Sequence, residues 1–163
     1  MAETFEITDE MRSEIGIESE PWPYEVTTTG IRAFARGVGY EDTVYYDPEA
    51  ARRAGYRRLP APPCYLGTPV FLPGRSDVVF SGPPGTGPRP RYGLDHVLDG
   101  GTEVVYERPV GAGETLMVTT RLLDLQAKQS RSLGTMLIVT SEATFRDRRG
   151  EVAARERSRH IFY

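Results

Sequence analysis

Four segments in the C-terminal part of the chain are rich in valine, threonine, isoleucine, leucine and aromatic residues, and they constrain the fold most. They cover residues 102–109, 115–126, 135–146 and 152–162. β-branched and aromatic side chains favour strands. The separators are short and contain turn-forming glycine, serine and aspartate residues, which predicts hairpins. We therefore expect the four strands to form an antiparallel meander.

Two helices are predicted before these strands. The first has an apolar stripe with helical spacing, formed by Ile31, Phe34, Ala35 and Val38. The second is bounded by residues that cap, start and stop a helix, namely Asp47, Pro48 and Gly55. A further short helix is expected within residues 64–72. Helices followed by an antiparallel sheet form the α+β pattern, in which helical segments cover one face of the sheet.

Both faces of the third predicted strand are largely apolar. Alternation gives one face Met136, Ile138 and Thr140 and the opposite face Leu137, Val139 and Ser141. One face can pack on the helices, so we expect a second subunit to cover the other. The last strand differs, because it carries three alternate residues predicted to face solvent: Arg155, Arg157 and Arg159.

The length and composition indicate one domain over residues 1–163. Of these 163 residues, 39% are hydrophobic and 26% are charged, which is typical of a globular chain. Residues 73–93 are rich in glycine and proline. A loop of this length within a compact domain is a candidate lid.

Charge and cysteine content argue against several partners and sites. The net charge is −3, and the basic residues are too dispersed for a nucleic-acid-binding face. Cys64 is the only cysteine, so no disulfide, cysteine zinc cluster or other metal site is expected. The first residues lack a signal-peptide pattern, and no stretch approaches the roughly 20 apolar residues that span a bilayer. We expect a cytoplasmic protein without membrane contact.

Side chains that commonly act in catalysis are scarce. The only histidines are His96 and His160, and we expect both to be structural or exposed. Cys64, which follows two prolines, is expected to be a small buried hydrophobe. The residues by themselves therefore indicate an oligomeric α+β domain with a lid-like loop, and no reaction.

Three segments, in this order and spacing, resemble the MaoC-like hydratase/dehydratase family, in particular its N-terminal-type branch and the dehydratase subunits of fatty-acid elongation. The first comprises residues 23–27 and 31–36, the second residues 39–47, 54–56 and 61–63, and the third residues 106–116. The resemblance implies a hotdog fold, with an antiparallel sheet wrapped around a central helix, and subunit pairs that form acyl-thioester tunnels. It also implies hydration of 2-enoyl or dehydration of (R)-3-hydroxyacyl thioesters, carried by coenzyme A or acyl carrier protein, without a further cofactor.

The resemblance also shows a departure at the catalytic motif. Catalytic members carry Gly-Asp-x-Asn-Pro-x-His, in which Asp and His activate the attacking water. Here Tyr40 stands at the Asp position, Asp42 at the Asn position and Tyr45 at the His position. A phenol has an ordinary pKa of about 10 and is a poor base at neutral pH, so the water-activating pair is absent.

A second departure concerns the thioester oxygen, which catalytic members polarise with a glycine N–H in an Ala-His-Gly segment. Alignment of Ala61 with that alanine places Pro62 and Pro63 at the next two positions. Proline has no N–H, so this donor is lost too. We expect residues 61–63 to contact the substrate, and Arg57 and Arg58 to meet phosphates of coenzyme A or the acidic face of acyl carrier protein.

Three functions remain open. The first is a non-catalytic, substrate-holding subunit whose Asp and His come from a catalytic MaoC-like partner. The second is a self-sufficient homodimeric enzyme that uses Glu41, Asp42 or Tyr45 as acid or base. The third is a protein that binds acyl thioesters without catalysis, with residues 73–93 closing over the ligand. We favour the first, because three functional elements of the family motif are missing together.

Overall fold

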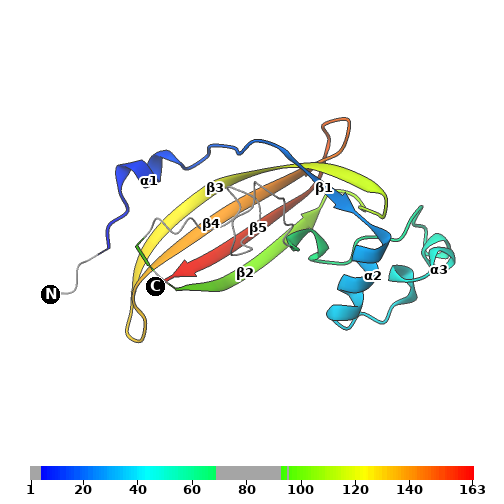
Figure 1. The fold of residues 1–163 in the computed structure, drawn as a ribbon, viewed down its shortest axis with the longest axis horizontal. Helices are drawn as coiled ribbons and strands as arrows, with labels where there is room; N and C mark the ends of the chain where they lie inside the picture. Colours follow the sequence, from blue (N-terminus) through cyan, green and yellow to red (C-terminus); the bar gives the residue numbers. More distant parts are fainter. Residues whose placement is uncertain (1–4, 69–92, 95) are drawn as a thin grey trace.

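The computed structural model describes residues 5–68, 93–94 and 96–163. The described elements are α1 (Asp9–Ser13), β1 (Trp22–Val26), α2 (Thr28–Gly37), η1 (Thr43–Tyr45), α3 (Pro48–Arg53), η2 (Tyr65–Gly67), β2 (Val97–Tyr106), β3 (Glu114–Ser130), β4 (Gly134–Arg146) and β5 (Val152–Phe162). Figure 1 shows the strands in one sheet, with α2 and α3 at one end and α1 towards the other. The candidate lid at 73–93 lies outside the described residues except for Gly93.

The strand order is β1-β3-β4-β5-β2, and every neighbouring pair is antiparallel. The four predicted strands are confirmed, and β3, β4 and β5 form the expected meander. The prediction of a hairpin between β2 and β3 is wrong, because β2 pairs with β5 at the other side of the sheet. Residues 107–113 form a crossover instead, and its backbone bonds to residues 59–61, with Ala61 N–H donating to the Val110 carbonyl at 2.7 Å.

β1 was not predicted from the sequence. It is short and contains Pro23, which cannot donate a ladder hydrogen bond. The strand is nevertheless stable at the sheet edge, where it pairs with β3 only. Its alternate residues Trp22, Tyr24 and Val26 are buried, as expected for a strand with one face on the core.

Both predicted helices are confirmed, and the second has its predicted cap. The hydroxyl of Thr27 accepts from the Gly30 N–H at 2.9 Å at the start of α2. The carboxylate of Asp47 accepts from the N–H groups of Glu49 and Ala50 at 3.0 and 3.1 Å at the start of α3. Only the described part of the helix expected at 64–72 can be compared, and it forms the single 3-10 turn η2.

The buried side chains form two clusters on one sheet face, which we call the inward face. The first cluster lies near α2 and includes Tyr24, Ile31, Tyr65, Leu116 and Phe145. The second lies further along the sheet and consists of Leu125, Leu137, Val139 and Phe162, with Phe5, Ile7 and Met11 of the N-terminal segment packed against it. Helical and N-terminal segments therefore cover the same face, as the α+β pattern predicted.

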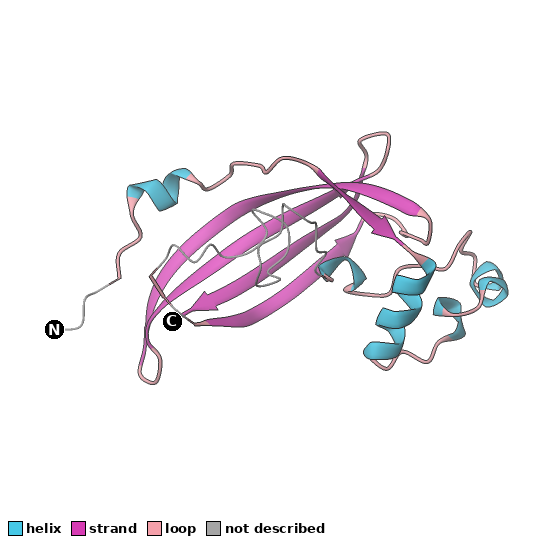
Figure 2. Cartoon of the chain, viewed as in Figure 1, coloured by secondary structure: helices cyan, strands magenta, loops and turns pink. Residues whose placement is uncertain are grey.

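The opposite, outward face is less apolar than predicted. Glu142 in the middle of this face is only 2% exposed, and its carboxylate accepts from Arg121 at 2.7 Å and from Arg157 at 3.0 Å. Arg157 and Arg159 are exposed, as predicted, and Arg155 is half-buried. Figure 2 shows that the helices are short compared with the long strands of the sheet. None of the described helices has the length and hydrophobicity needed to cross a lipid bilayer.

Candidate functional site

Two cavities adjoin where the turn after α3 meets the crossover between β2 and β3. The arginine cavity has a volume of about 500 Å³, and its lining includes Arg57, Arg58, Arg108 and Glu114. The tyrosine cavity has a volume of about 460 Å³, and its lining includes Tyr45, Ala61, Pro63, Cys64, Val104 and Tyr106. Tyr56, Pro60 and the start of the crossover line both, so the two cavities form one elongated site.

The tyrosine cavity is built from three separate stretches of chain. Tyr45 ends η1, residues 60–64 form the turn before η2, and Val104 and Tyr106 end β2. The phenol of Tyr106 donates to the Pro62 carbonyl at 3.1 Å and thereby joins β2 to this turn. Burial raises the pKa of Tyr106, so its phenol stays protonated at neutral pH.

Tyr45, at the position of the family histidine, is also a protonated phenol. Burial raises its pKa first, and the neighbouring Asp42 carboxylate raises it further. The ring of Tyr40 lies 5.7 Å from the ring of Tyr45 and supports it from outside the cavity. A general base needs a pKa near neutral pH, and these surroundings move the pKa of Tyr45 further above neutrality.

The two candidate carboxylates do not line either cavity. Asp42 caps η1 by accepting from the Val44 N–H at 3.1 Å. Glu41 is exposed to solvent. Of the three residues considered as acid or base, the structure therefore brings only Tyr45 into the site.

The turn of residues 61–64 contributes backbone as well as side chains. Pro63 lines the tyrosine cavity, whereas Pro62 is buried beneath it and offers its carbonyl to Tyr106. Cys64 has φ 61° and ψ 4°, a left-handed conformation that is uncommon for a residue with a side chain. Cys64 is exposed in the cavity, so the prediction that it is buried is wrong. The left-handed backbone turns the chain sharply, which explains why Cys64 is not folded into the core.

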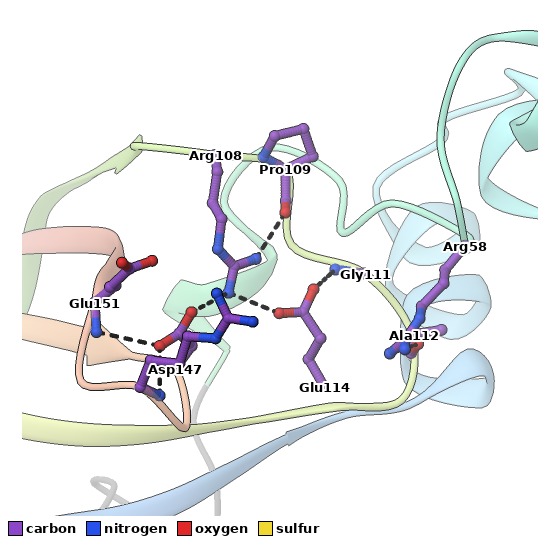
Figure 3. A network of polar contacts seen from close by, with 9 residues as sticks. Arg58, Arg108, Pro109, Gly111, Ala112, Glu114, Asp147 and Glu151 are labelled. Atoms are coloured by element: carbon purple, nitrogen blue, oxygen red, sulfur yellow. Dashed lines mark hydrogen bonds and ion pairs between the residues drawn. The ribbon is translucent and has the colours of Figure 1, made fainter.

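The arginine cavity contains one ion-paired arginine and two that have no ion pair among the described residues. Arg108 contacts Glu114 at 2.9 Å and Asp147 at 3.4 Å, as Figure 3 shows, and it holds the crossover in place. Arg58 donates to the Ala112 carbonyl at 3.4 Å, an acceptor without a formal charge. Within the described residues, neither Arg57 nor Arg58 has a carboxylate at ion-pair distance.

The structure therefore unites most predicted contact residues and adds others. Tyr45, Ala61 and Pro63 meet in one cavity, and Arg57 and Arg58 line the other. Sequence reasoning missed Tyr106 and Arg108, although both lie in the segment 106–116 that carries the family resemblance. The available signal was that segment itself, but its proximity to residues 57–64 depends on the crossover. Among the described residues, no three His, Cys, Asp or Glu side chains gather as ligands for a metal ion.

Structural comparison shows which fold this is. One chain of the ChsH1-ChsH2 complex from Mycobacterium tuberculosis has a TM-score of 0.66 at 22% identity, covering 90% of this chain and 88% of that chain. The C-terminally truncated HadBC (3R-hydroxyacyl-ACP dehydratase) complex from the same organism gives 0.66 at 18%, covering 91% and 96%. A MaoC-like dehydratase gives 0.68 at 23%, covering 93% of this chain and only 42% of that chain. The expected hotdog fold is confirmed.

Sequence comparison shows the family. Residues 13–156 match the family described as "FAS1-like, dehydratase domain region". A UPF0336 protein of Streptomyces avermitilis is 37% identical over 107 residues, which cover 64% of this chain and 65% of that protein. A UPF0336 protein of Parafrankia sp. is 34% identical over 134 residues, which cover 81% of this chain and 80% of that protein. The chain therefore belongs to the FAS1-like dehydratase domain family, among the MaoC-like hotdog proteins.

Proposed function

We propose that this chain is the substrate-holding subunit of a heteromeric (R)-specific 2-enoyl-thioester hydratase or 3-hydroxyacyl-thioester dehydratase that acts in the cytoplasm. The observation that carries the proposal is the elongated site, in which a cavity lined by arginines adjoins a cavity lined by tyrosines and apolar groups. An acyl thioester of coenzyme A or acyl carrier protein has the same division, with phosphates at one end and an apolar chain at the other.

The composition of the site supports holding rather than catalysis. Hydration of an enoyl thioester needs a base that activates water and a donor that returns a proton. Tyr45 is a protonated phenol with a raised pKa, and Asp42 and Glu41 lie outside both cavities. The carboxylates that do line the cavities, Glu107 and Glu114, are ion-paired with Arg155 and Arg108. The acid and base are therefore assigned to a partner subunit that carries the family's Asp and His.

The free edge of the sheet supports a partner subunit. Among the described strands, β2 lies at the sheet edge and pairs with β5 only, so within this part of the chain its other side offers N–H and C=O groups for pairing. Apolar side chains on this strand are exposed: Val97, Leu98 and Val105. Similar chains occur in the heteromeric ChsH1-ChsH2 and HadBC complexes. β2 also contributes Val104 and Tyr106 to the tyrosine cavity, so a subunit paired there lies next to the substrate.

The first experiment measures hydration of crotonyl-CoA by loss of enoyl absorbance. The chain alone is expected to be inactive, and the chain with a co-purifying MaoC-like subunit is expected to be active. Activity of the chain alone that disappears in Tyr45→Phe contradicts the proposal and favours the self-sufficient homodimer. Binding of acyl-CoA without activity in any mixture favours the simple acyl-thioester-binding protein.

The second experiment tests the phosphate end of the site. Arg57→Glu with Arg58→Glu is expected to weaken octanoyl-CoA binding at least about tenfold, because two positive charges near the phosphates are reversed. The matched control is Arg148→Glu with Arg149→Glu, two adjacent exposed arginines between β4 and β5 that line neither cavity. Equal weakening by both double variants would show a general charge effect and dismiss the phosphate contact.

A further inference from the structure

Glu156 lies beside the tyrosine cavity, on the inward face of the sheet. It is directly opposite Val104 of β2 and Ala143 of β4. Residues directly opposite in antiparallel strands share a face. Val104 lines the tyrosine cavity, and Ala143 packs against the first core cluster. The Glu156 side chain therefore shares the inward face with Val104 and lies next to the tyrosine cavity, although Glu156 itself does not line it.

The Glu156 carboxyl group has no hydrogen bond or ion pair within the described part of the chain. Burial is the cause that raises its pKa, to about 7. Its two strand neighbours, Val104 and Ala143, are apolar and offer no compensation. Glu156 is half-buried. A carboxyl group without a protein partner in such surroundings favours a ligand group that pairs with it.

Other polar side chains continue from Glu156 along the inward face. Ser158 and His160 follow at alternate positions on β5, and Ser158 lies opposite Ser141 of β4 and Thr102 of β2. We call these five residues the polar track. It separates the first core cluster from the second, so the inward face is apolar at both ends and polar between them. His160, expected to be structural or exposed, is half-buried on this face.

The track has a definite place relative to the substrate. Tyr106 marks the turn of residues 61–64 through its bond to Pro62, and Val104 and Glu156 lie one inward-facing position further along the sheet. Two residues of a strand span about 6.6 Å, which is the length of several methylene groups. A chain that enters past Tyr106 therefore reaches Glu156 well beyond its thioester.

We propose, building on the proposed function, that Glu156 and the polar track select acyl chains that carry a hydrogen-bonding oxygen, such as a hydroxyl group, beyond the thioester end. A hydroxyl group donates to the carboxylate and accepts from the carboxylic acid, so either form of Glu156 binds it. A plain alkyl chain would remove water from the track and replace none of its hydrogen bonds.

The other titratable groups on this side of the sheet do not account for the proposed preference for a hydroxylated acyl chain. Tyr24 of β1, Tyr65 of η2 and Tyr106 of β2 all have a raised pKa because of burial, so they stay neutral. Tyr24 and Tyr106 already donate to the carbonyls of Tyr65 and Pro62. Burial lowers the pKa of His160, against the effect of Asp99, so its imidazole is neutral near pH 7 and above.

The test compares the affinities of octanoyl-CoA and ω-hydroxyoctanoyl-CoA by isothermal titration calorimetry. The unmodified chain is expected to bind the hydroxylated chain about tenfold more tightly, as for one hydrogen bond to an ionisable group. Glu156→Leu is expected to abolish this preference, and Glu156→Gln to retain most of it. The matched control is Glu103→Leu, at an exposed position on the outward face of β2, which is expected to keep the full preference.

Each outcome decides a different point. Equal affinity of the unmodified chain for both ligands overturns this inference and leaves the proposed function intact. No binding of either ligand, alone or with the catalytic partner, overturns both. A preference that survives Glu156→Leu, in a variant with an unchanged circular dichroism spectrum, removes Glu156 as its source. The comparison on the unmodified chain needs no variant, so misfolding of Glu156→Leu leaves the test decisive.

Discussion

The phenol of Tyr106 donates to the carbonyl of Pro62 across 3.1 Å and joins the end of β2 to the turn that forms the tyrosine cavity. A second buried phenol, that of Tyr24, donates to the Tyr65 carbonyl at the same distance, but Tyr24 does not line the cavity. Both are hydrogen bonds from a phenol to a backbone carbonyl, but only Tyr106 lines the cavity. Variants of the two tyrosines can therefore distinguish an effect on stability from an effect on ligand binding.

Tyr106→Phe and Tyr24→Phe are expected to lower the free energy of unfolding by similar amounts, about 1 kcal/mol each, because each removes one of two hydrogen bonds that its carbonyl accepts. Only Tyr106→Phe is expected to weaken acyl-CoA binding, since only that bond positions the cavity wall. Urea unfolding and titration calorimetry measure the two effects. Equal loss of affinity in both variants contradicts the assigned role of Tyr106.

Glu156 gives the protein a pH dependence of definite sign. Its pKa rises from the ordinary 4.5 to about 7 in the folded chain, so the folded state holds its proton to higher pH than the unfolded state does. The free energy of unfolding therefore falls as pH rises through this window, by up to about 3 kcal/mol. Glu156→Gln is expected to remove that fall.

Urea unfolding between about pH 5 and pH 8 measures this difference. His160 contributes in the opposite direction, because burial lowers its pKa and its stabilising neutral form is gained as pH rises. The difference between the unmodified chain and Glu156→Gln cancels that contribution. A pH profile that is the same in both proteins contradicts the burial of an unpaired carboxyl group at this position.

Glu142 has the reverse pH dependence. Burial by itself would raise its pKa, but hydrogen bonds from Arg121 and Arg157 outweigh burial and hold the pKa below the ordinary 4.5. Stability from Glu142 is complete above that ordinary value and is lost as pH falls towards the lowered one. Glu142→Gln is expected to lower the free energy of unfolding at neutral pH by about 1 to 3 kcal/mol.

The exposed pair of Arg155 and Glu107 is the control for Glu142. Their ends are 2.7 Å apart, but both side chains are more than 40% exposed, at 42% and 49%. Solvent weakens such a pair, so Glu107→Gln is expected to change stability by less than about 1 kcal/mol. A larger effect at Glu107 than at Glu142, measured by urea unfolding, would show that burial of Glu142 is unimportant.

Two glycines in α2 are expected to respond to alanine in opposite ways. A Cβ on Gly30 would lie 2.6 Å from the Tyr65 hydroxyl and 2.9 Å from the Thr27 hydroxyl, which caps the helix. A Cβ on Gly37 meets nothing within 4 Å. Gly30→Ala should therefore lower the melting temperature, and Gly37→Ala should raise it through a helix-propensity gain of up to about 1 kcal/mol. Stabilisation by both variants would show that Tyr65 moves freely.

Local features of the sequence predicted the helices and most strands. Thr27 and Asp47 cap the helices they precede, and Pro48 occupies the first turn as expected. These interactions join residues a few positions apart, so they do not depend on how the rest of the chain folds. The strands β3, β4 and β5 were predictable for the same reason, since their side-chain alternation and turns are local. β1 was not predicted because it contains Pro23, and proline is unfavourable in most strands. The strand forms because it lies at the sheet edge, where a missing N–H is acceptable.

The functional site was predictable only in part. The family resemblance selected Tyr45, residues 61–63 and the arginine pair, and the structure places most of these around two adjoining cavities. It did not select Glu156, although the alternation that turns Arg155, Arg157 and Arg159 to solvent turns Glu156 to the opposite face. Its burial follows from strand pairing, because β2 and β4 flank β5 and turn every second residue inward.

Short-range chemistry was therefore sufficient for the α+β class, the helix caps and the family to which the chain belongs. Long-range pairing settled the rest. β2 crosses to β5 instead of turning back on β3, and this crossover brings Tyr106 and Arg108 to residues 57–64. Such pairing depends on which buried surfaces fit together across the whole chain, and no local pattern of residues encodes that fit.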